Sequence, residues 1–196
     1  YSAMRERSVG LGVMGFHSFL QKKQIPLESV MSKVWNNKIF KHIQTKVDQA
    51  SKILAEERGA CPDAEEYSFK ERFSNKTAIA PTASISIISG GASPGVEPFA
   101  ANSYTHKTLS GSYNVRNKYL EKILEKYGKN NEKIWSSITT NQGSVSHLDF
   151  LTELEKDVFK TAFELDQKWV VELGADRTPY ISQAQSINIF LPADVQ

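Results

Sequence analysis

The chain has 196 residues, of which 40% are apolar and 23% charged, and its formal net charge is +2. This composition is typical of a soluble globular protein, and the absence of a basic run interleaved with aromatic residues argues against nucleic-acid binding. No apolar stretch reaches the roughly 18 residues of a membrane span, the start lacks the apolar core of a signal peptide, and the single cysteine, Cys61, favours a reducing cytoplasm.

The first third of the sequence predicts two helices. One runs from about Leu11 to Gln21. Pro26 stands where a second helix could begin, because the N–H groups of the first helical turn have no acceptor within the helix and proline lacks only such an N–H. From Leu27 onward the apolar residues recur at spacings of three and four, which predicts a long amphipathic helix that ends before Gly59.

The middle of the chain contains less regular structure. Residues 61–75 are polar, and we expect a loop with a short turn. Residues 76–80, KTAIA, are typical of a short buried strand. Residues 90–106 are rich in Gly, Pro and Ala, which predicts an irregular loop; loops of this length are often functional.

Helices return in the last third of the chain. Asn117 is a suitable cap for a helix that ends before Gly128, and residues 130–140 are consistent with another short helix. Thr152 and Glu155 form a capping box before a long helix through residues 154–174. A final strand is expected at Ser186–Pro192.

Long helices that alternate with few, short strands indicate the α/β class with parallel strands. Two or three strands make a poor sheet alone, so we expect the chain to be a piece of a larger fold.

Three glycines raise the possibility of a dinucleotide site. Gly10, Gly12 and Gly15 spell G-x-G-x-x-G, but this fingerprint needs a preceding strand and an acidic residue about 20 positions later. The residues before Gly10 make a poor strand, and residues 33–38 contain no acid. We therefore favour close packing of a helix on these small residues.

The other chemically interesting side chains favour structural roles. The single cysteine has no histidine near it in the sequence, and the four histidines lack the spacing of metal ligands, so we expect no metal site. The carboxylates Glu97, Asp149 and Asp176 are more typical of loops and helix ends than of acid–base pairs. The cysteine is Cys61, and the four histidines are His17, His42, His106 and His147.

Residues 78–91, AIAPTASISIISGG, are the strongest candidate site. Thr82, Ser84 and Ser86 follow the end of the expected strand and could open a helix. Unpaired N–H groups at a helix N-terminus and neighbouring hydroxyls can bind phosphate without a lysine. The residues alone leave two possibilities open, phosphate binding and a simple capped turn.

Four segments resemble the large, catalytic subunit of the class I ribonucleotide reductase family. They are RSVGLGVMGFHSFLQ (7–21), LAEERGACPDA (54–64), NKTAIAPTASISIISGGASPGVEPFAANSYTHKTLSG (75–111) and YISQAQSINIFLPADV (180–195), and they occur in the family's order. The resemblance implies that residues 1–196 are the C-terminal portion of a ten-stranded α/β barrel domain made of two antiparallel halves.

The resemblance also implies an activity and a site. The family reduces ribonucleoside diphosphates to deoxyribonucleoside diphosphates, and the loop matching Pro81, Thr82, Ala83, Ser84 and Ile85 binds the substrate's diphosphate. The family pattern has a hydroxyl residue at the fifth position, so Ile85 is expected to contribute only its backbone.

The resemblance assigns no catalytic residue to this segment. The family's radical cysteine, its redox cysteine pair and the nearby Asn and Glu lie upstream, its paired tyrosines follow residue 195, and neither Cys61 nor Tyr180 occupies such a position. The segment is expected to bind no cofactor itself. The implied enzyme depends on a radical from a metal-containing small subunit and on a thioredoxin- or glutaredoxin-type reductant. It also needs the rest of the large subunit, which is either part of the same chain or a split partner. The large subunit is expected to form a homodimer. The alternative is a non-catalytic nucleotide- or phosphate-binding domain.

Overall fold

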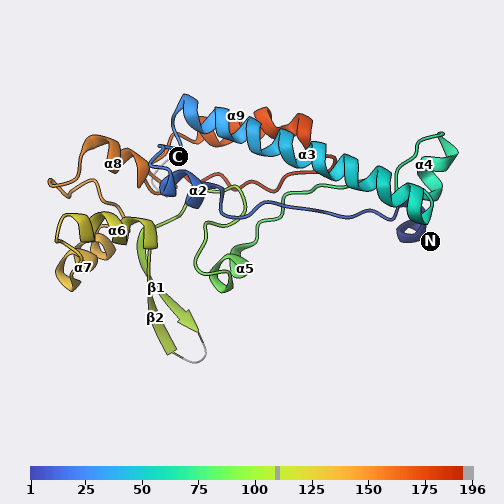
Figure 1. Cartoon of the computed structure of the whole chain (residues 1–196). Helices are drawn as coiled ribbons and strands as arrows, with labels where there is room; N and C mark the ends of the chain where they lie inside the picture. Colours follow the sequence, from blue (N-terminus) through green and yellow to red (C-terminus); the bar gives the residue numbers. More distant parts are fainter. Residues whose placement is uncertain (109–110, 192–196) are drawn as a thin grey trace. The chain divides into compact units, whose positions relative to one another are not determined.

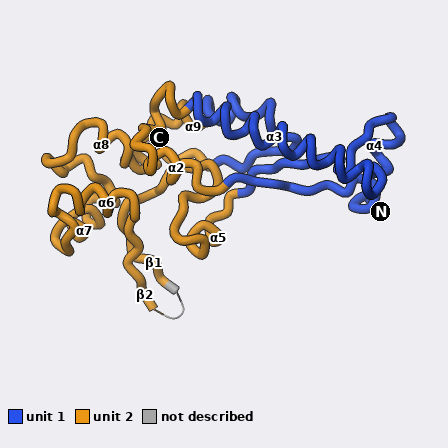
Figure 2. Tube along the Cα trace, in the orientation of Figure 1, with its two compact units in different colours: residues 1–13, 33–80, 171–187 blue, residues 14–32, 81–170, 188–196 orange. Residues whose placement is uncertain are grey.

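The computed structural model describes residues 1–108 and 111–191, shown in Figure 1 along the sequence. Two compact units divide the chain: unit 1 contains residues 1–13, 33–80 and 171–187, and unit 2 contains residues 14–32, 81–170 and those from 188 on (Figure 2). The regular elements are α1 (Ser2–Glu6), α2 (Phe16–Lys22), α3 (Val30–Arg58), α4 (Pro62–Glu66), α5 (Ala83–Ile88), β1 (Ser103–Thr108), β2 (Gly111–Arg116), α6 (Lys118–Lys126), α7 (Glu132–Thr140), α8 (Glu153–Val158), α9 (Gln167–Arg177) and the 3₁₀ helix η1 (Thr178–Tyr180).

Three extended segments lie side by side in unit 1 (blue in Figure 2). Leu11 pairs with Thr77, and Ile79 pairs with Gln185, both in the parallel direction. The pairs are isolated bridges rather than continuous ladders, and within the described residues no barrel closes. The extended conformation of residues 76–80 and the parallel direction agree with the sequence-based expectation.

The strand expected at Ser186–Pro192 is wrong for the residues that the structure describes, and its last residue lies outside them. Asn188 N–H donates to Glu97 Oε1, and Phe190 N–H donates to Gln167 Oε1, both at 3.0 Å. Because these N–H groups pair with side chains, they form no ladder with a neighbouring strand.

Helix α3 confirms the long helix of the sequence analysis, although it begins at Val30 rather than near Pro26. Ser29 Oγ accepts a hydrogen bond from Ser32 N–H at 3.2 Å, the contact of an N-terminal cap. Gly59, at φ +79°, follows the last turn as expected. Among the described residues no helix combines the length and the apolar character that crossing a membrane requires.

A buried arginine joins three elements of unit 1. Arg177, at the end of α9, donates from Nε to Gln185 Oε1 at 2.7 Å and from Nη1 to Asn36 Oδ1 at 3.1 Å. Asn36 also donates to Leu173 O at 2.9 Å. Burial lowers the pKa of Arg177 to about 10, so the side chain remains charged at neutral pH and is held by neutral amides.

The apolar core of unit 2 lies among α6, α7, α8 and the segment between α7 and α8. Its buried members are Leu120, Leu124, Trp135, Ile138, Val145, Leu148, Leu151, Val158 and Phe159. Local sequence signals start these helices: Asn117 accepts from Tyr119 N–H at 3.0 Å, and Thr152 forms the expected capping box with Glu155. The helices expected near 118–127 and 130–140 are therefore confirmed.

The single helix expected through residues 154–174 is wrong, because α8 ends at Val158 and α9 begins at Gln167. In the segment between them, Ala162 N–H donates to Phe99 O at 2.8 Å. Asp166 Oδ1 then accepts from Lys168 N–H at 2.9 Å and starts the second helix. A contact between residues distant in sequence thus replaces the helical bonds that the local pattern indicated.

The structure contains a β-hairpin that the sequence did not predict, and the helix expected from about Leu11 begins later. Strands β1 and β2 pair antiparallel, so the irregular loop expected at residues 90–106 ends as a strand (Figure 1). Helix α2 begins at Phe16 rather than near Leu11, because Gly15 adopts φ +82° and caps it. The short turn expected within residues 61–75 is the helix α4.

Candidate phosphate site at the start of helix α5

Thr82 is the N-cap of α5 and has an unusual backbone conformation. Its φ of +49° and ψ of +28° lie in the left-handed region, which a β-branched residue rarely adopts. Its side chain does not cap the helix; instead Thr82 Oγ1 accepts a hydrogen bond from Gly95 N–H at 2.7 Å. Backbone strain of this kind costs about 1–3 kcal/mol and persists only where the surrounding structure holds it.

The first turn of α5 presents unpaired donors. Within the described part of the chain, the N–H groups of Ala83, Ser84 and Ile85 donate to no acceptor, whereas Ser86 N–H closes the turn on Thr82 O at 2.9 Å. Ser84 is exposed, so its hydroxyl is accessible from solvent. The turn therefore has three N–H groups and a hydroxyl that could bind an anion.

The serine at position 86 differs from its neighbours. Ser86 is buried and its hydroxyl donates to Ala83 O at 2.7 Å. This bond stabilises the turn and uses the hydroxyl proton of Ser86. Ser86 is therefore not a donor to a phosphate, unlike the expectation from the sequence.

A cavity of about 700 Å³ lies in unit 2 beside α5. Residues of α5 line part of it, and the rest of the lining includes small residues, aromatic and amide side chains and one arginine, among them Ala83, Ser86, Ile87, Phe99, Tyr104, Phe163, Asn102, Asn117 and Arg116. The two asparagines are tied to one another, since Asn117 Nδ2 donates to Asn102 Oδ1 at 2.8 Å. Burial raises the pKa of Tyr104, so the phenol of this wall stays protonated at neutral pH.

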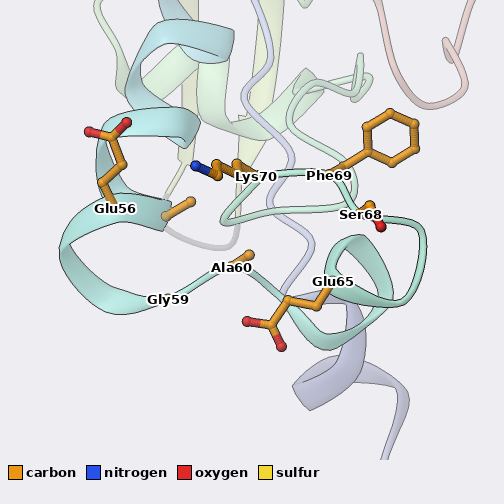
Figure 3. A pocket seen from close by; sticks show the side chains of 8 residues that line it. Glu56, Gly59, Ala60, Glu65, Ser68, Phe69 and Lys70 are labelled. Atoms are coloured by element: carbon orange, nitrogen blue, oxygen red, sulfur yellow. The ribbon is translucent and has the colours of Figure 1, made fainter.

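A second cavity, of about 430 Å³, lies in unit 1 beside the end of α3 and α4 (Figure 3). Glu56, Glu65 and Lys70 line it together with Phe69. Two carboxylates against one ammonium make this cavity a poor site for an anion.

The glycine fingerprint has a packing role, but not against a helix. A Cβ atom at Gly12 would lie 2.8 Å from Ala78 O, so this glycine allows two extended segments to approach. Gly15 instead supplies the positive φ at the start of α2. This geometry supports the packing interpretation over a dinucleotide site and corrects the element involved.

The other candidate side chains are dispersed. His17 is buried and its Nδ1 accepts from Phe99 N–H at 3.0 Å, while His42 and His147 are exposed and His106 lies on β1. Cys61 is buried at the start of α4. No group of three or more His, Cys, Asp and Glu among the described residues is arranged to hold a metal ion.

Glu97 has a structural contact rather than an acid–base partner. It is 4% exposed, and its Oε1 accepts from Asn188 N–H at 3.0 Å and from Asn188 Nδ2 at 2.8 Å. This carboxylate therefore fastens the segment around Asn188 to the loop before Pro98.

Sequence reasoning did not identify the residues that support Thr82. Gly95 follows Ser93 and Pro94, a combination that signals a turn but does not reveal what the turn contacts. Its partner lies 13 positions away in the chain, so only the folded structure brings the two together.

Comparisons with known proteins found similar sequences and a similar structure. The family model for the ribonucleotide reductase barrel domain matches residues 1–72 and 68–196. The ribonucleoside-diphosphate reductase large subunit of Invertebrate iridescent virus 6 is 49% identical over 198 residues, which cover 99% of this chain and 20% of that protein. The corresponding large subunit of Invertebrate iridescent virus 3 is 45% identical over 197 residues, covering 99% of this chain and 31% of that protein.

A solved structure is also similar. The class Id ribonucleotide reductase alpha subunit of Actinobacillus ureae has a TM-score of 0.86 and 43% identity, over 95% of this chain and 34% of that one. The chain spans about a fifth to a third of the length of the curated relatives it matches.

Proposed function

Because the chain belongs to the ribonucleotide reductase barrel-domain family, we propose that it forms part of the large subunit of a ribonucleoside-diphosphate reductase. This enzyme reduces ribonucleoside diphosphates to deoxyribonucleoside diphosphates by radical chemistry. Residues 1–196 are the C-terminal portion of its ten-stranded α/β barrel domain. The family match over the whole chain and the parallel pairs in unit 1 support this assignment.

Pro81, Thr82, Ala83, Ser84 and Ile85 bind the diphosphate of the substrate in this proposal. The observation that carries it is the first turn of α5, where three N–H groups are unpaired and the Thr82 hydroxyl is held in place by Gly95. Ile85 contributes its N–H alone, because its side chain has no donor.

The chemistry itself belongs to residues outside this segment. A radical cysteine and a redox pair need three thiols, and the chain has the single Cys61, which is buried. This segment therefore binds and orients the substrate and supplies scaffold. The other steps are supplied by the remainder of the large subunit, by a small radical-generating subunit with a metal centre, and by a dithiol reductant. The large subunit acts as a homodimer in the reducing cytoplasm.

The test removes the two hydroxyls of the phosphate loop in the full-length large subunit. Thr82→Val with Ser84→Ala should raise KM for a ribonucleoside diphosphate about a hundredfold or more, because two charge-assisted bonds are lost and each contributes roughly 1.5–3 kcal/mol. Steady-state kinetics with the small subunit and reductant measure this change.

Ser89→Ala is the matched control. Ser89 is an exposed serine at the other end of α5, so its removal should leave KM unchanged. If the double variant keeps the KM and kcat of the parent enzyme, the phosphate assignment is wrong.

A further inference from the structure

The start of α2 is capped by a serine from a distant loop. The N-cap residue, Gly15, has no side chain to perform this role. Ser18 N–H instead donates to Ser93 Oγ at 3.1 Å, and Ser93 N–H donates to Ser18 Oγ at 2.8 Å. Both serines are buried, at 3% and 0% exposure. The two residues satisfy each other's N–H groups reciprocally, as a capping box does within one helix.

The backbone of α2 fastens the same loop. Gly15 N–H donates to Ser93 O at 2.9 Å, and Phe16 N–H donates to Gly95 O at 3.3 Å. Together with the serine pair, four hydrogen bonds hold residues 93–95 against the first turn of α2. Residues 93–95 are thus fixed from outside α5.

These residues in turn hold the side chain of Thr82. Gly95 N–H is the donor in its bond to Thr82 Oγ1, so the hydroxyl proton of Thr82 is not used in that bond. Within the residues described, this hydroxyl proton has no acceptor. It is therefore available to a ligand beside the unpaired N–H groups of α5.

We propose that Ser18 and Ser93 are positioning residues for the phosphate loop, an inference that rests on the proposed substrate site. Their reciprocal pair fixes residues 93–95, Gly95 then fixes the Thr82 hydroxyl, and Thr82 donates to a phosphate oxygen of the substrate. Neither serine touches the ligand.

The sequence of contacts explains how a β-branched residue keeps its left-handed conformation. Releasing Gly95 allows Thr82 to relax toward a common backbone conformation, and this turns both its hydroxyl and the following N–H groups. A displacement of about 1 Å at a binding group can cost up to a hundredfold in rate or affinity, so the serine pair affects substrate binding from a distance.

The experiment uses the full-length large subunit with its small subunit, and CDP as the probe substrate. Ser93→Ala and Ser18→Ala should each raise KM for CDP roughly tenfold while kcat changes less than about twofold. Ser18→Thr keeps the hydroxyl and should restore the parent KM. The Ser18→Cys variant keeps the approximate size of the side chain but has a weaker hydrogen-bond acceptor. It replaces Ser18→Ala in the measurement if the alanine variant does not fold.

A double-mutant cycle separates positioning from general stability. Once Thr82→Val has removed the hydroxyl, adding Ser93→Ala should raise KM by much less than tenfold, because both changes act through one group. Ser32→Ala is the matched control: Ser32 is a buried serine of unit 2 whose hydroxyl donates to Leu27 O at 2.6 Å. It should lower Tm and leave KM unchanged.

The outcomes are distinct. If Ser93→Ala and Ser18→Ala lower Tm as Ser32→Ala does and leave KM unchanged, while Thr82→Val raises KM, the positioning role is wrong and the phosphate site stands. Additive effects of Ser93→Ala and Thr82→Val on KM also contradict the positioning role. If Thr82→Val leaves KM unchanged, the proposed phosphate site itself fails.

Discussion

His17 shows how one buried side chain makes stability depend on pH. It is 1% exposed in unit 2, and its Nδ1 accepts from Phe99 N–H, so the proton of the neutral ring is on Nε2. Burial lowers its pKa from 6.5 to about 3. Between these values the unfolded chain binds a proton that the folded chain does not, so the free energy of unfolding falls as pH falls from 6.5 toward 3.

We therefore expect His17 to lower the free energy of unfolding by about 2 kcal/mol between pH 7 and pH 5, given about 1.4 kcal/mol for each unit of pKa difference. The variant His17→Asn retains an acceptor near the Nδ1 position and does not titrate in this range. Urea unfolding of both proteins at the two pH values measures the difference. Equal losses in parent and variant would show that His17 is not the group responsible.

At the scale of elements, the extended segments of unit 1 depend on the absence of a side chain at one glycine. A Cβ atom at Gly12 would lie 2.8 Å from the backbone oxygen of Ala78, whereas a Cβ atom at Gly10 would lie 3.4 Å from the Cβ of Ala78. Two neighbouring glycines in one segment thus differ in the room available to them. The backbone of the adjacent segment, which is already paired, has little freedom to move.

Gly12→Ala should accordingly destabilise the protein by roughly 1–3 kcal/mol, the usual cost of overpacking a tight contact. Gly10→Ala is the matched control and should cost much less. Thermal or urea unfolding of the two variants provides the comparison. Equal stability of the two variants would contradict the close approach.

The cap of α8 makes a second prediction about elements. Thr152 Oγ1 accepts from Glu155 N–H at 3.2 Å, and Glu155 Oε2 accepts from Thr152 N–H at 2.9 Å. Thr152→Ala removes one half of this box and should lower the free energy of unfolding by about 1 kcal/mol. Thr45→Ala, at an exposed position on α3, should lower it little or not at all. A loss at Thr45 as large as that at Thr152 would count against the cap.

At the scale of the whole molecule, several large apolar side chains face solvent. Ile88 is 85% exposed on α5, Val30 is 72% exposed at the start of α3, and Met4 is 70% exposed on α1. Among the residues that the structure describes, the extended segments of unit 1 pair only through isolated bridges, so their edges lack continuous strand partners. Exposed apolar residues together with open strand edges favour association with another chain or with the rest of a larger fold.

Residues 1–196 produced alone should therefore self-associate, and light scattering after gel filtration should show species larger than the 22.0 kDa of one chain. Production together with the remaining part of a related large subunit should reduce this association. A monomer that unfolds cooperatively and binds a nucleoside diphosphate by itself would instead favour the alternative, a non-catalytic nucleotide-binding domain.

The sequence by itself determined the features that depend on neighbours a few residues apart. The periodicity of α3, its glycine stop, the caps Asn117 and Thr152, and the hydroxyl-rich start of α5 were all predictable, because a turn or a cap is completed within about four residues. The match of spaced segments to a known family was likewise a property of the sequence.

Only the tertiary structure decided the features that depend on distant partners. The break between α8 and α9 involves a bond from Ala162 to Phe99, and the extended segment near Leu11 pairs with residues more than 60 positions away. The support of Thr82 likewise comes from Gly95 and the two serines that fix it. Such hydrogen bonds replace local ones whenever folding brings a better-placed acceptor to a buried N–H, and nothing in the nearby sequence records that acceptor.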